Sequence, residues 1–433
     1  MINPDKRTIV ILAAACLGIS IFIPSSRSNA EEFIVTQQMS CGTLGDSERK
    51  EWENDAVLGK TAALNNLGFM YILGCGVKSD AQRARDYFEQ AADKGDAQAE
   101  HNLGYLYDKG GIGVAQNSAL AFAWYAKAAA KGFAQSELSL ATMYQAGRGV
   151  TKDPVRAVEL LRQAADQKLP SAQYQLGAAY DSGEGVGRDY TQAMMWYQKA
   201  AAQNDPNALA AIGYLYEYGR GVAQDFSSAM RWYQAAAALG GAVGQNNLGG
   251  LYETGKGVAP DAAQAAIWYA KAAAQGLPTA NANLGALYAT GRGVPRDYQR
   301  ATELFSAAAR GGNAKGEYNL GVAYLTGKGV GQDYVRARQL FEEASAQNNP
   351  RAQYDLAVMY LSGVGMEKDF SKALELLRKS AETGNGDAQN ELGSMFENGI
   401  GVSKDISTAV VLYKKAASNG SLKAKEALRR LSY

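Results

Sequence analysis

The chain has 433 residues, with 44 Lys and Arg residues against 43 Asp and Glu residues. Its formal net charge of +1 gives no electrostatic basis for binding nucleic acid or an anionic membrane surface. The single histidine excludes a histidine-rich metal site, because such sites need several imidazole ligands.

Residues 1–30 have the pattern of a secretory signal peptide. Two basic residues precede an apolar run over residues 9–23, and small residues end at Ala30. A run of this length is shorter than the roughly 20 apolar residues of a membrane-spanning helix. We therefore expect cleavage between Ala30 and Glu31 and a periplasmic or secreted protein with no later membrane span.

The three cysteines allow two further hypotheses. Cys16 follows three alanines inside the apolar run, so lipidation at Cys16 is an alternative to cleavage at Ala30. Cys41 and Cys75 remain after processing, in a compartment where disulfides persist. An even pair predicts one disulfide, Cys41–Cys75, and the alternative is two independent small side chains.

The remaining chain divides into four predicted segments. Residues 31–46 form a lead-in segment, and residues 47–59 form an N-terminal cap helix. Ten repeats occupy residues 60–420, and residues 421–433 form a C-terminal cap helix. Arg429 stands in this last helix where each repeat has a small residue, as expected when no further helix packs on it.

A small residue, usually the glycine of a Leu-Gly pair, marks each of the ten repeats. Neighbouring markers are 36 residues apart, except for one spacing of 37; they are Gly68, Gly104, Ala141, Gly177, Gly213, Gly249, Gly285, Gly321, Ala357 and Gly393. A fixed period of this length is typical of a solenoid, in which each unit buries its apolar face only by stacking on the next.

Each repeat predicts two helices joined by a glycine turn. In the repeat from Ala172, apolar residues at helical spacing precede the turn Gly183-Glu184-Gly185-Val186. Asp189 then caps a second helix, and an Asp or Asn stands at this position in all ten repeats. Alanine always follows four residues later, as Ala193 does here, which indicates close contact between two helix backbones. Gly or Asn ends the second helix in every repeat but one, where Lys168 stands.

These motifs closely resemble the Sel-one-like repeat family, a longer relative of the tetratricopeptide repeat. The shared pattern is Leu-Gly-x-x-Tyr, Gly-x-Gly-Val, Asp, Ala, Trp-Tyr and Lys-Ala-Ala over residues 60 to 420. The resemblance implies an all-α fold, a right-handed α/α superhelical solenoid of about ten helix-turn-helix repeats whose first helices line the inner surface. It also implies an adaptor that holds other proteins, in roles such as envelope regulation, polysaccharide export or contact with host cells.

Polar and aromatic side chains on the first helices form the candidate binding surface. On a helical wheel they lie opposite the packed side. Amides can bond an extended peptide backbone of any sequence, and tyrosines give contact area at small entropic cost. The candidates are Asn66, Asn102, Tyr105, Tyr174, Gln175, Tyr214, Asn247, Asn283, Tyr318, Asn319, Tyr354 and Asp355. The alternative is that these positions are merely solvated and that the tyrosines lean on the adjacent layer.

No motif in the sequence predicts catalysis or a cofactor. His101 occupies a position that other repeats fill with Tyr, Asn or Ala, which favours a surface role. The Gly-x-Gly turns follow helices rather than strands, so turn geometry explains them better than phosphate binding. Ser47-Glu48-Arg49-Lys50 matches the Ser-x-x-Lys motif of penicillin-interacting enzymes, but no Lys-Thr-Gly accompanies it.

We therefore predict an exported, non-enzymatic scaffold that binds a protein or peptide ligand along its inner face, without a cofactor or metal. Two alternatives remain open. Cysteine-rich relatives have been linked to β-lactams, which suggests an enzyme acting on β-lactams or the cell wall, although this chain lacks their cysteine pair per repeat. An envelope component that handles polysaccharide would use the same tyrosines as platforms for sugars.

Overall fold

The computed structural model describes residues 46–111 and 113–432, and all of its regular elements in these ranges are α-helices. Residues 1–30, residues 31–45 of the lead-in segment, Cys16 and Cys41 lie outside this part of the chain. The prediction of an all-α repeat fold is confirmed. The structure has a helix at each predicted cap, α1 (Asp46–Val57) and α22 (Leu422–Arg430).

Between these end helices, each repeat consists of a first and a second helix. The first helices are α2 (Thr61–Leu73), α4 (Ala97–Lys109), α6 (Ala134–Ala146), α8 (Pro170–Ser182), α10 (Pro206–Tyr218), α12 (Ala242–Thr254), α14 (Pro278–Thr290), α16 (Ala314–Thr326), α18 (Pro350–Ser362) and α20 (Gly386–Asn398). The second helices are α3 (Ala81–Ala92), α5 (Ser118–Ala130), α7 (Pro154–Asp166), α9 (Tyr190–Ala201), α11 (Phe226–Ala238), α13 (Ala262–Ala274), α15 (Tyr298–Arg310), α17 (Tyr334–Ala346), α19 (Phe370–Glu382) and α21 (Ile406–Ser418).

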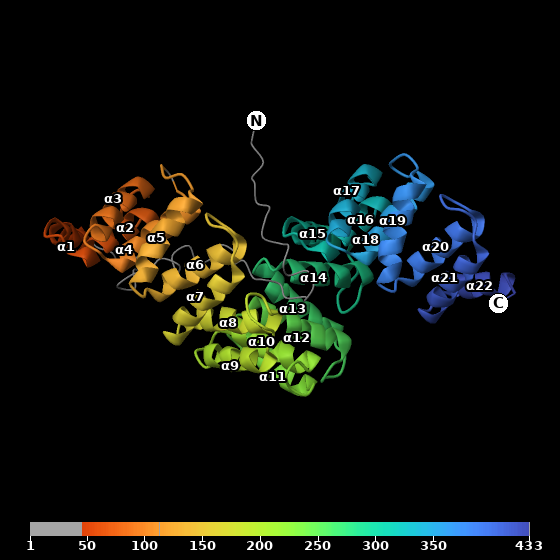
Figure 1. The fold of residues 1–433 in the computed structure, drawn as a ribbon, viewed down its shortest axis with the longest axis horizontal. Helices are drawn as coiled ribbons and strands as arrows, with labels where there is room; N and C mark the ends of the chain where they lie inside the picture. Colours follow the sequence, from red (N-terminus) through yellow and green to blue (C-terminus); the bar gives the residue numbers. More distant parts are fainter. Residues whose placement is uncertain (1–45, 112, 433) are drawn as a thin grey trace. The chain divides into compact units, whose positions relative to one another are not determined.

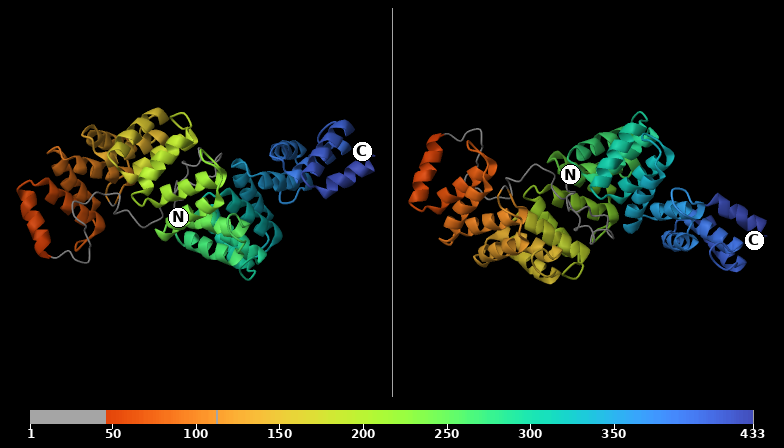
Figure 2. Two further views of the ribbon diagram at one scale, coloured as in Figure 1. Left: turned by 90° about the horizontal axis from the view of Figure 1, so that it is seen from below. Right: turned by 90° about the horizontal axis from the view of Figure 1, so that it is seen from above.

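The helices group into two compact units. Among the described residues these units are 46–244 and 245–432, and the boundary falls inside α12. Within each unit, successive helices lie side by side, as the views in Figures 1 and 2 show. First helices of neighbouring repeats also touch, for example α14 and α16.

The predicted caps fix where every second helix begins. All ten Asp or Asn caps have extended backbone and accept hydrogen bonds from the free N–H groups of the first turn. Asp189, for example, accepts from the backbone N–H groups of Thr191 and Gln192. The prediction of these helix starts is therefore confirmed.

The turn after each second helix requires a left-handed residue. Glycine or asparagine adopts a positive φ at this position in nine repeats, and Lys168 adopts one as well, at 65°. A lysine side chain disfavours this conformation, at a cost of about 1 kcal/mol. The turn geometry is therefore kept in all ten repeats, even where the residue type departs from the pattern.

The two helices of a repeat are held together by an aromatic ring packed on the marker glycine. Eight repeats pair the marker with a Tyr or Phe of the second helix, and a Cβ atom built on the glycine would lie only 2.4–2.8 Å from the ring. In Gly321, for example, it would lie 2.7 Å from Phe341, whose side chain is fully buried. The ring thus occupies the space that any larger marker would need.

The two alanine markers support this explanation. Ala141 and Ala357 belong to the repeats whose second helix has a leucine in place of the ring, Leu161 and Leu377. All four side chains are fully buried. The added methyl group of the marker is therefore matched by a smaller partner, so that the helices still pack closely.

A second buried contact links the start of the first helix to the end of the second. The fourth residue of the first helix bonds a residue near the end of the second helix in five repeats, 30 positions later or, for Glu100, 31 positions later. The pairs are Lys131–Glu100 at 2.9 Å, Gln167–Glu137 at 2.9 Å, Gln203–Gln173 at 2.9 Å, Gln275–Gln245 at 2.9 Å and Gln347–Glu317 at 2.7 Å. Asn419 and Gln389 form a sixth such pair at 2.9 Å. These pairs satisfy polar groups that the packing removes from water.

The marker contact predicts a paired rescue. Gly321→Ala forces the methyl group into the Phe341 ring, and should lower the free energy of unfolding by about 1–3 kcal/mol. Gly321→Ala combined with Phe341→Leu reproduces the Ala–Leu repeats and should recover most of this loss. Chemical denaturation followed by circular dichroism measures both. Gly331→Ala is the control, because a Cβ atom there meets nothing within 4 Å. A double variant less stable than Gly321→Ala would contradict the explanation.

Glu317 predicts a pH dependence of stability. Burial raises the pKa of Glu317 to about 7, the charge of Glu343 adds to the rise, and the hydrogen bond from Gln347 opposes it. The unfolded chain therefore releases this proton at lower pH than the folded chain. The stabilisation is fully present below about pH 4.5 and is lost as the pH rises through about 7.

Glu317→Gln should remove this loss of stability at high pH. Glutamine already stands at the equivalent position of other repeats, as Gln173, Gln245 and Gln389. Urea denaturation at pH 5 and pH 8 measures the effect, with Glu303→Gln as an exposed control. The variant should gain stability over the parent at pH 8 and less at pH 5. An equal effect at both pH values would show that Glu317 does not titrate in this range.

Candidate functional site

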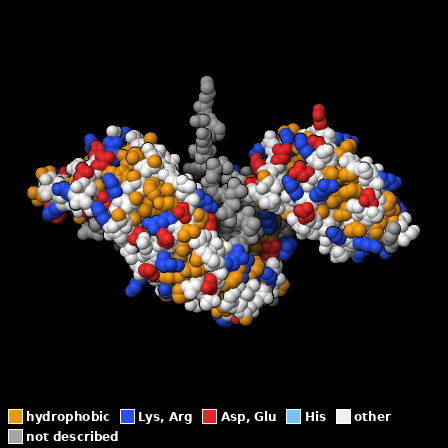
Figure 3. Space-filling view, viewed as in Figure 1, with side chains coloured by type: hydrophobic (Ala, Val, Ile, Leu, Met, Phe, Trp, Pro, Cys, Tyr) orange, Lys and Arg blue, Asp and Glu red, His pale blue; other side chains and the backbone are white. Residues whose placement is uncertain are grey.

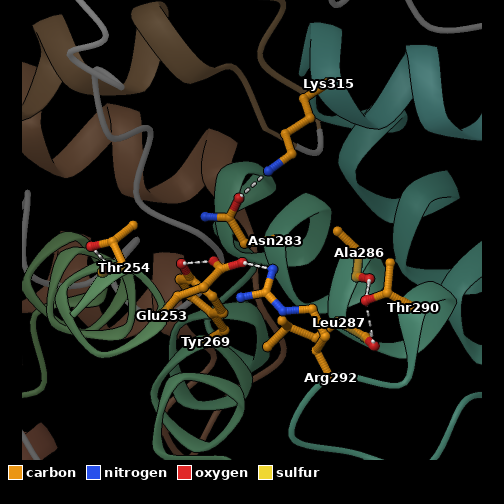
Figure 4. Close-up of polar contacts among 10 residues, drawn as sticks. Glu253, Thr254, Tyr269, Asn283, Ala286, Leu287, Thr290, Arg292 and Lys315 are labelled. Atoms are coloured by element: carbon orange, nitrogen blue, oxygen red, sulfur yellow. Dashed lines mark hydrogen bonds and ion pairs between the residues drawn. The ribbon is translucent and has the colours of Figure 1, made fainter. Parts of the chain in front are cut away.

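Polar clusters between neighbouring repeats hold the first helices in place. Figure 4 shows one of them, in which Tyr269, Glu253 and Arg292 come together from α13, α12 and the turn after α14. The Tyr269 hydroxyl donates to Glu253 at 2.8 Å, and Arg292 pairs with the same carboxylate at 3.2 Å. The carboxylate therefore joins its own repeat to the next.

A carboxylate stands at the position of Glu253 wherever the second-helix ring is a tyrosine. Each of these five repeats has an Asp or Glu at the twelfth residue of its first helix, whereas the three phenylalanine repeats have Ile, Ala or Leu there. Three further carboxylates pair with an arginine of the following turn or cap helix: Asp108–Arg148 at 2.5 Å, Asp181–Arg220 at 3.7 Å and Glu397–Arg430 at 2.5 Å. A second-helix tyrosine hydroxyl therefore occurs only in repeats whose first helix has a carboxylate at its twelfth residue.

Asparagine side chains form a ladder between neighbouring first helices. Asn102 donates to Asn65 at 3.1 Å, and Asn283 donates to Asn246 at 3.0 Å. Lys315 in turn donates to the Asn283 side chain at 2.8 Å, as Figure 4 shows. Two of the predicted binding residues, Asn102 and Asn283, therefore use part of their hydrogen-bonding capacity within the protein.

Three predicted residues are not accessible in this structure. Asn66 is 6% exposed, Asn102 is 0% exposed and Tyr105 is 5% exposed. A partner could not reach their side chains without a rearrangement. We therefore leave these three residues out of the candidate site.

The predicted tyrosines are partly buried and lean on other aromatic rings. Tyr174 lies 5.8 Å from Tyr197 and Tyr318 lies 5.8 Å from Phe341, measured between ring centroids within the same repeat. Tyr214 lies 4.5 Å from Tyr218. These three rings therefore pack on rings of their own repeat, whereas the alternative drawn from the sequence was packing on the adjacent layer, and they keep part of their surface exposed.

The predicted amides differ in how far the protein uses them. Asn247 accepts a hydrogen bond from Asn246 at 3.1 Å. Gln175 and Asn319 are partly exposed, and among the described residues neither side chain has a hydrogen-bond partner. These amides can bond a ligand without breaking a contact in the protein.

The residues at 318, 354 and 355 come together in a surface depression. Its volume is about 590 Å³, and it lies entirely within the unit 245–432. Tyr318 of α16 and Tyr354 and Asp355 of α18 line it together with Pro350, Arg351, Thr383, Gly384, Asn385 and Asp387. Two neighbouring repeats and the start of a third therefore build one concave site of predominantly polar side chains.

The depression carries a negative electrostatic environment around its tyrosines. Burial raises the pKa of Tyr354 to about 12, and the charges of Glu391, Asp387 and Asp355 act in the same direction. Burial also raises the pKa of Asp355, an effect that Tyr318 and Arg351 oppose. Tyr318 and Arg351 therefore offset only part of the cost of burying the Asp355 carboxylate, which remains a hydrogen-bond acceptor.

The comparison with known families identifies the repeats. The model of the Sel1 repeat matches ten consecutive segments: 61–96, 97–133, 134–169, 170–205, 206–241, 242–277, 278–313, 314–349, 350–385 and 386–421. The chain belongs to the Sel1 repeat family. The resemblance to Sel-one-like repeats is therefore confirmed, and proteins of this family are generally non-catalytic scaffolds for protein interactions.

Two solved structures and one curated protein are similar to this Sel1 repeat chain. A protective antigen of uropathogenic Escherichia coli strains, c5321, is 32% identical with a TM-score of 0.52, and the match covers 87% of this chain and 89% of that chain. A Sel1 repeat protein from Oxalobacter formigenes is 31% identical with a TM-score of 0.48, over 71% and 89% of the two chains. The third is from Arabidopsis thaliana, the "ERAD-associated E3 ubiquitin-protein ligase component HRD3B". It is 48% identical over 50 residues, which span 11% of this chain and 8% of that protein.

Sequence reasoning missed two charged residues of the depression in this Sel1 repeat protein. Arg351 and Asp387 each occupy the second residue of a first helix, one turn before the positions that were selected. Residues three or four apart on a helix share a face, so extending the selected face by one turn would have included Arg351 with Tyr354 and Asp355.

Other sites considered in the sequence are less informative. His101 is buried, not a surface residue as predicted: its ring lies 5.3 Å from that of Tyr125, and its Nδ1 atom is 2.9 Å from the Ser136 hydroxyl. Cys75 is buried as well, and the Cys41–Cys75 disulfide stays a prediction because Cys41 lies outside the described residues. Over the described residues, no cluster of three metal-ligating side chains occurs and no helix could cross a membrane.

Proposed function

We propose that this Sel1 repeat protein is an exported, non-enzymatic scaffold that binds a protein or peptide along the exposed side of its first helices. The observation that carries the proposal is the set of partly exposed amides and tyrosines on neighbouring first helices of the unit 245–432. It begins at Asn247 and ends in the depression around Tyr354. The export part rests on the signal-peptide pattern of residues 1–30.

The geometry of these side chains suits an extended ligand. Asn283 and Asn319 occupy the same position in consecutive first helices, and the α14 and α16 helices that carry them are in contact. Their amide groups can donate to and accept from main-chain groups, while the tyrosines cover apolar parts of the ligand. Rigid helices keep these groups in place before binding, which reduces the entropy lost on association.

The charges on the surface are consistent with selective rather than electrostatic capture. On the face drawn in Figure 3, basic and acidic side chains are interspersed over the described residues. A surface without one dominant sign attracts neither polyanions nor polycations at long range. The specificity for the partner then depends on short-range contacts along the first helices.

The proposal predicts that amide removal weakens partner capture. The triple variant Asn247→Ala, Asn283→Ala, Asn319→Ala should recover about tenfold less partner after crosslinking in the native cell envelope, because these amides would bond the ligand backbone. Quantitative mass spectrometry of the captured material measures the recovery. Far-UV circular dichroism of the purified variant should match that of the parent.

A matched control removes three exposed second-helix side chains of the same unit, with the substitutions Gln264→Ala, Gln299→Ala and Glu303→Ala. This control should recover as much partner as the parent. Equal loss in both triple variants, or no loss in the first, would reject the first-helix surface. If the parent captures no protein but binds a glycan on an array, the protein-binding function itself is wrong.

A further inference from the structure

We propose that the depression of the unit 245–432 receives a basic side chain, lysine or arginine, from the bound protein partner. This inference rests on the proposed function and adds the chemical class that one subsite selects. The site consists of the rings of Tyr318 and Tyr354 and the carboxylates of Asp355 and Asp387.

Two tyrosines, Tyr318 and Tyr354, line the depression and are suited to contact a cation. A Lys or Arg group is attracted to the face of an aromatic ring by the ring quadrupole. The same contact occurs within this protein on three second helices: Lys127 lies 3.8 Å from the Trp124 centroid, Lys199 lies 3.6 Å from Trp196 and Lys271 lies 3.9 Å from Trp268. In the depression, Tyr318 and Tyr354 come from different repeats, α16 and α18.

The carboxylates favour a cation over a neutral or negative group. Asp355 and Asp387 line the depression, and Arg351 is the one basic residue among the described lining residues. The Arg351 side chain is exposed, whereas Asp355 is partly buried. Two carboxylates against one exposed guanidinium leave a net negative site, and an incoming cation would be attracted to the less hydrated carboxylate.

The repeat that forms most of the depression lacks one hydrogen bond that other repeats make. Gln353 is 3% exposed, and in the described part of the chain its Oε1 atom has no hydrogen-bond partner. Six other repeats satisfy this position from the residue 30 or 31 places later, as Gln347 does for Glu317. Here that residue is Thr383, which lines the depression and donates its hydroxyl to the Ser380 carbonyl at 2.7 Å. Thr383 thus stands in the wall of the depression where those six repeats have a lysine, glutamine or asparagine donor.

The test uses the purified full-length protein and labelled peptides of alternating Gly and Ser with one central residue. The central residue is lysine, arginine, norleucine or glutamate, and norleucine has the length of lysine without its charge. Fluorescence anisotropy should show at least fivefold tighter binding of the lysine and arginine peptides. In the double variant Asp355→Asn, Asp387→Asn this preference should fall below twofold.

Ring variants separate a binding role from a folding role. Tyr354→Phe keeps the ring and should retain the preference within twofold, whereas Tyr354→Ala should lose most of it. Glu303→Gln removes an exposed carboxylate outside the depression and should leave the preference unchanged. Tighter binding of the glutamate peptide, which would indicate an anion site at Arg351, or a preference that survives the double variant overturns the inference.

If no short peptide binds measurably, the natural partner replaces the peptides in the capture experiment. A fivefold loss of partner recovery in Asp355→Asn, Asp387→Asn supports the basic subsite, and unchanged recovery overturns it while leaving the proposed function intact. Failure of the parent protein to capture any protein overturns the proposed function instead. The two hypotheses are thereby tested separately.

Discussion

The contact between a marker glycine and a second-helix ring is the constraint on which each repeat depends. The ring fills the space that a marker side chain would occupy, as the 2.7 Å approach of a Gly321 Cβ atom to Phe341 shows. Because the ring is buried in a packed interior, the marker can grow only if the ring shrinks. The Ala141–Leu161 and Ala357–Leu377 repeats satisfy the same constraint with a larger marker, alanine, and a smaller partner, leucine.

This packing determines which surfaces of the two helices in a repeat remain available to bind a partner. One side of each first helix packs on the ring or leucine of the second helix, and the buried fourth residue of the first helix is bonded to the end of the second helix in six repeats. The tyrosine–carboxylate–arginine clusters then join one repeat to the next, as Tyr269, Glu253 and Arg292 do. The remaining side of the first helices can vary without loss of the fold, which suits a scaffold whose specificity lies in separate side chains.

Local rules predicted the fold well, because the repeat period, the Asp caps and the turn residues are set by contacts within one repeat. The sequence also shows that a second-helix Tyr goes with an acidic residue at the twelfth position of the first helix, and a second-helix Phe with an apolar one. Only the structure explains this match, through the hydrogen bond from the Tyr hydroxyl to the carboxylate. The candidate site was predicted less completely. Helical spacing placed Tyr318, Tyr354 and Asp355 on one surface, yet it could not show that Asp387 from the next repeat closes the depression. Nor could it show that Asn102 is buried, because that depends on packing between repeats.

Hydrogen exchange of the protein, with and without its captured partner, tests the central claim most directly, because it reports on every repeat at once. The account predicts that the partner adds protection to peptides from the first helices α12, α14, α16, α18 and α20, while their second helices exchange at unchanged rates. Added protection confined to the second helices, or spread evenly over both helices of each repeat, would contradict a binding surface built on the first helices.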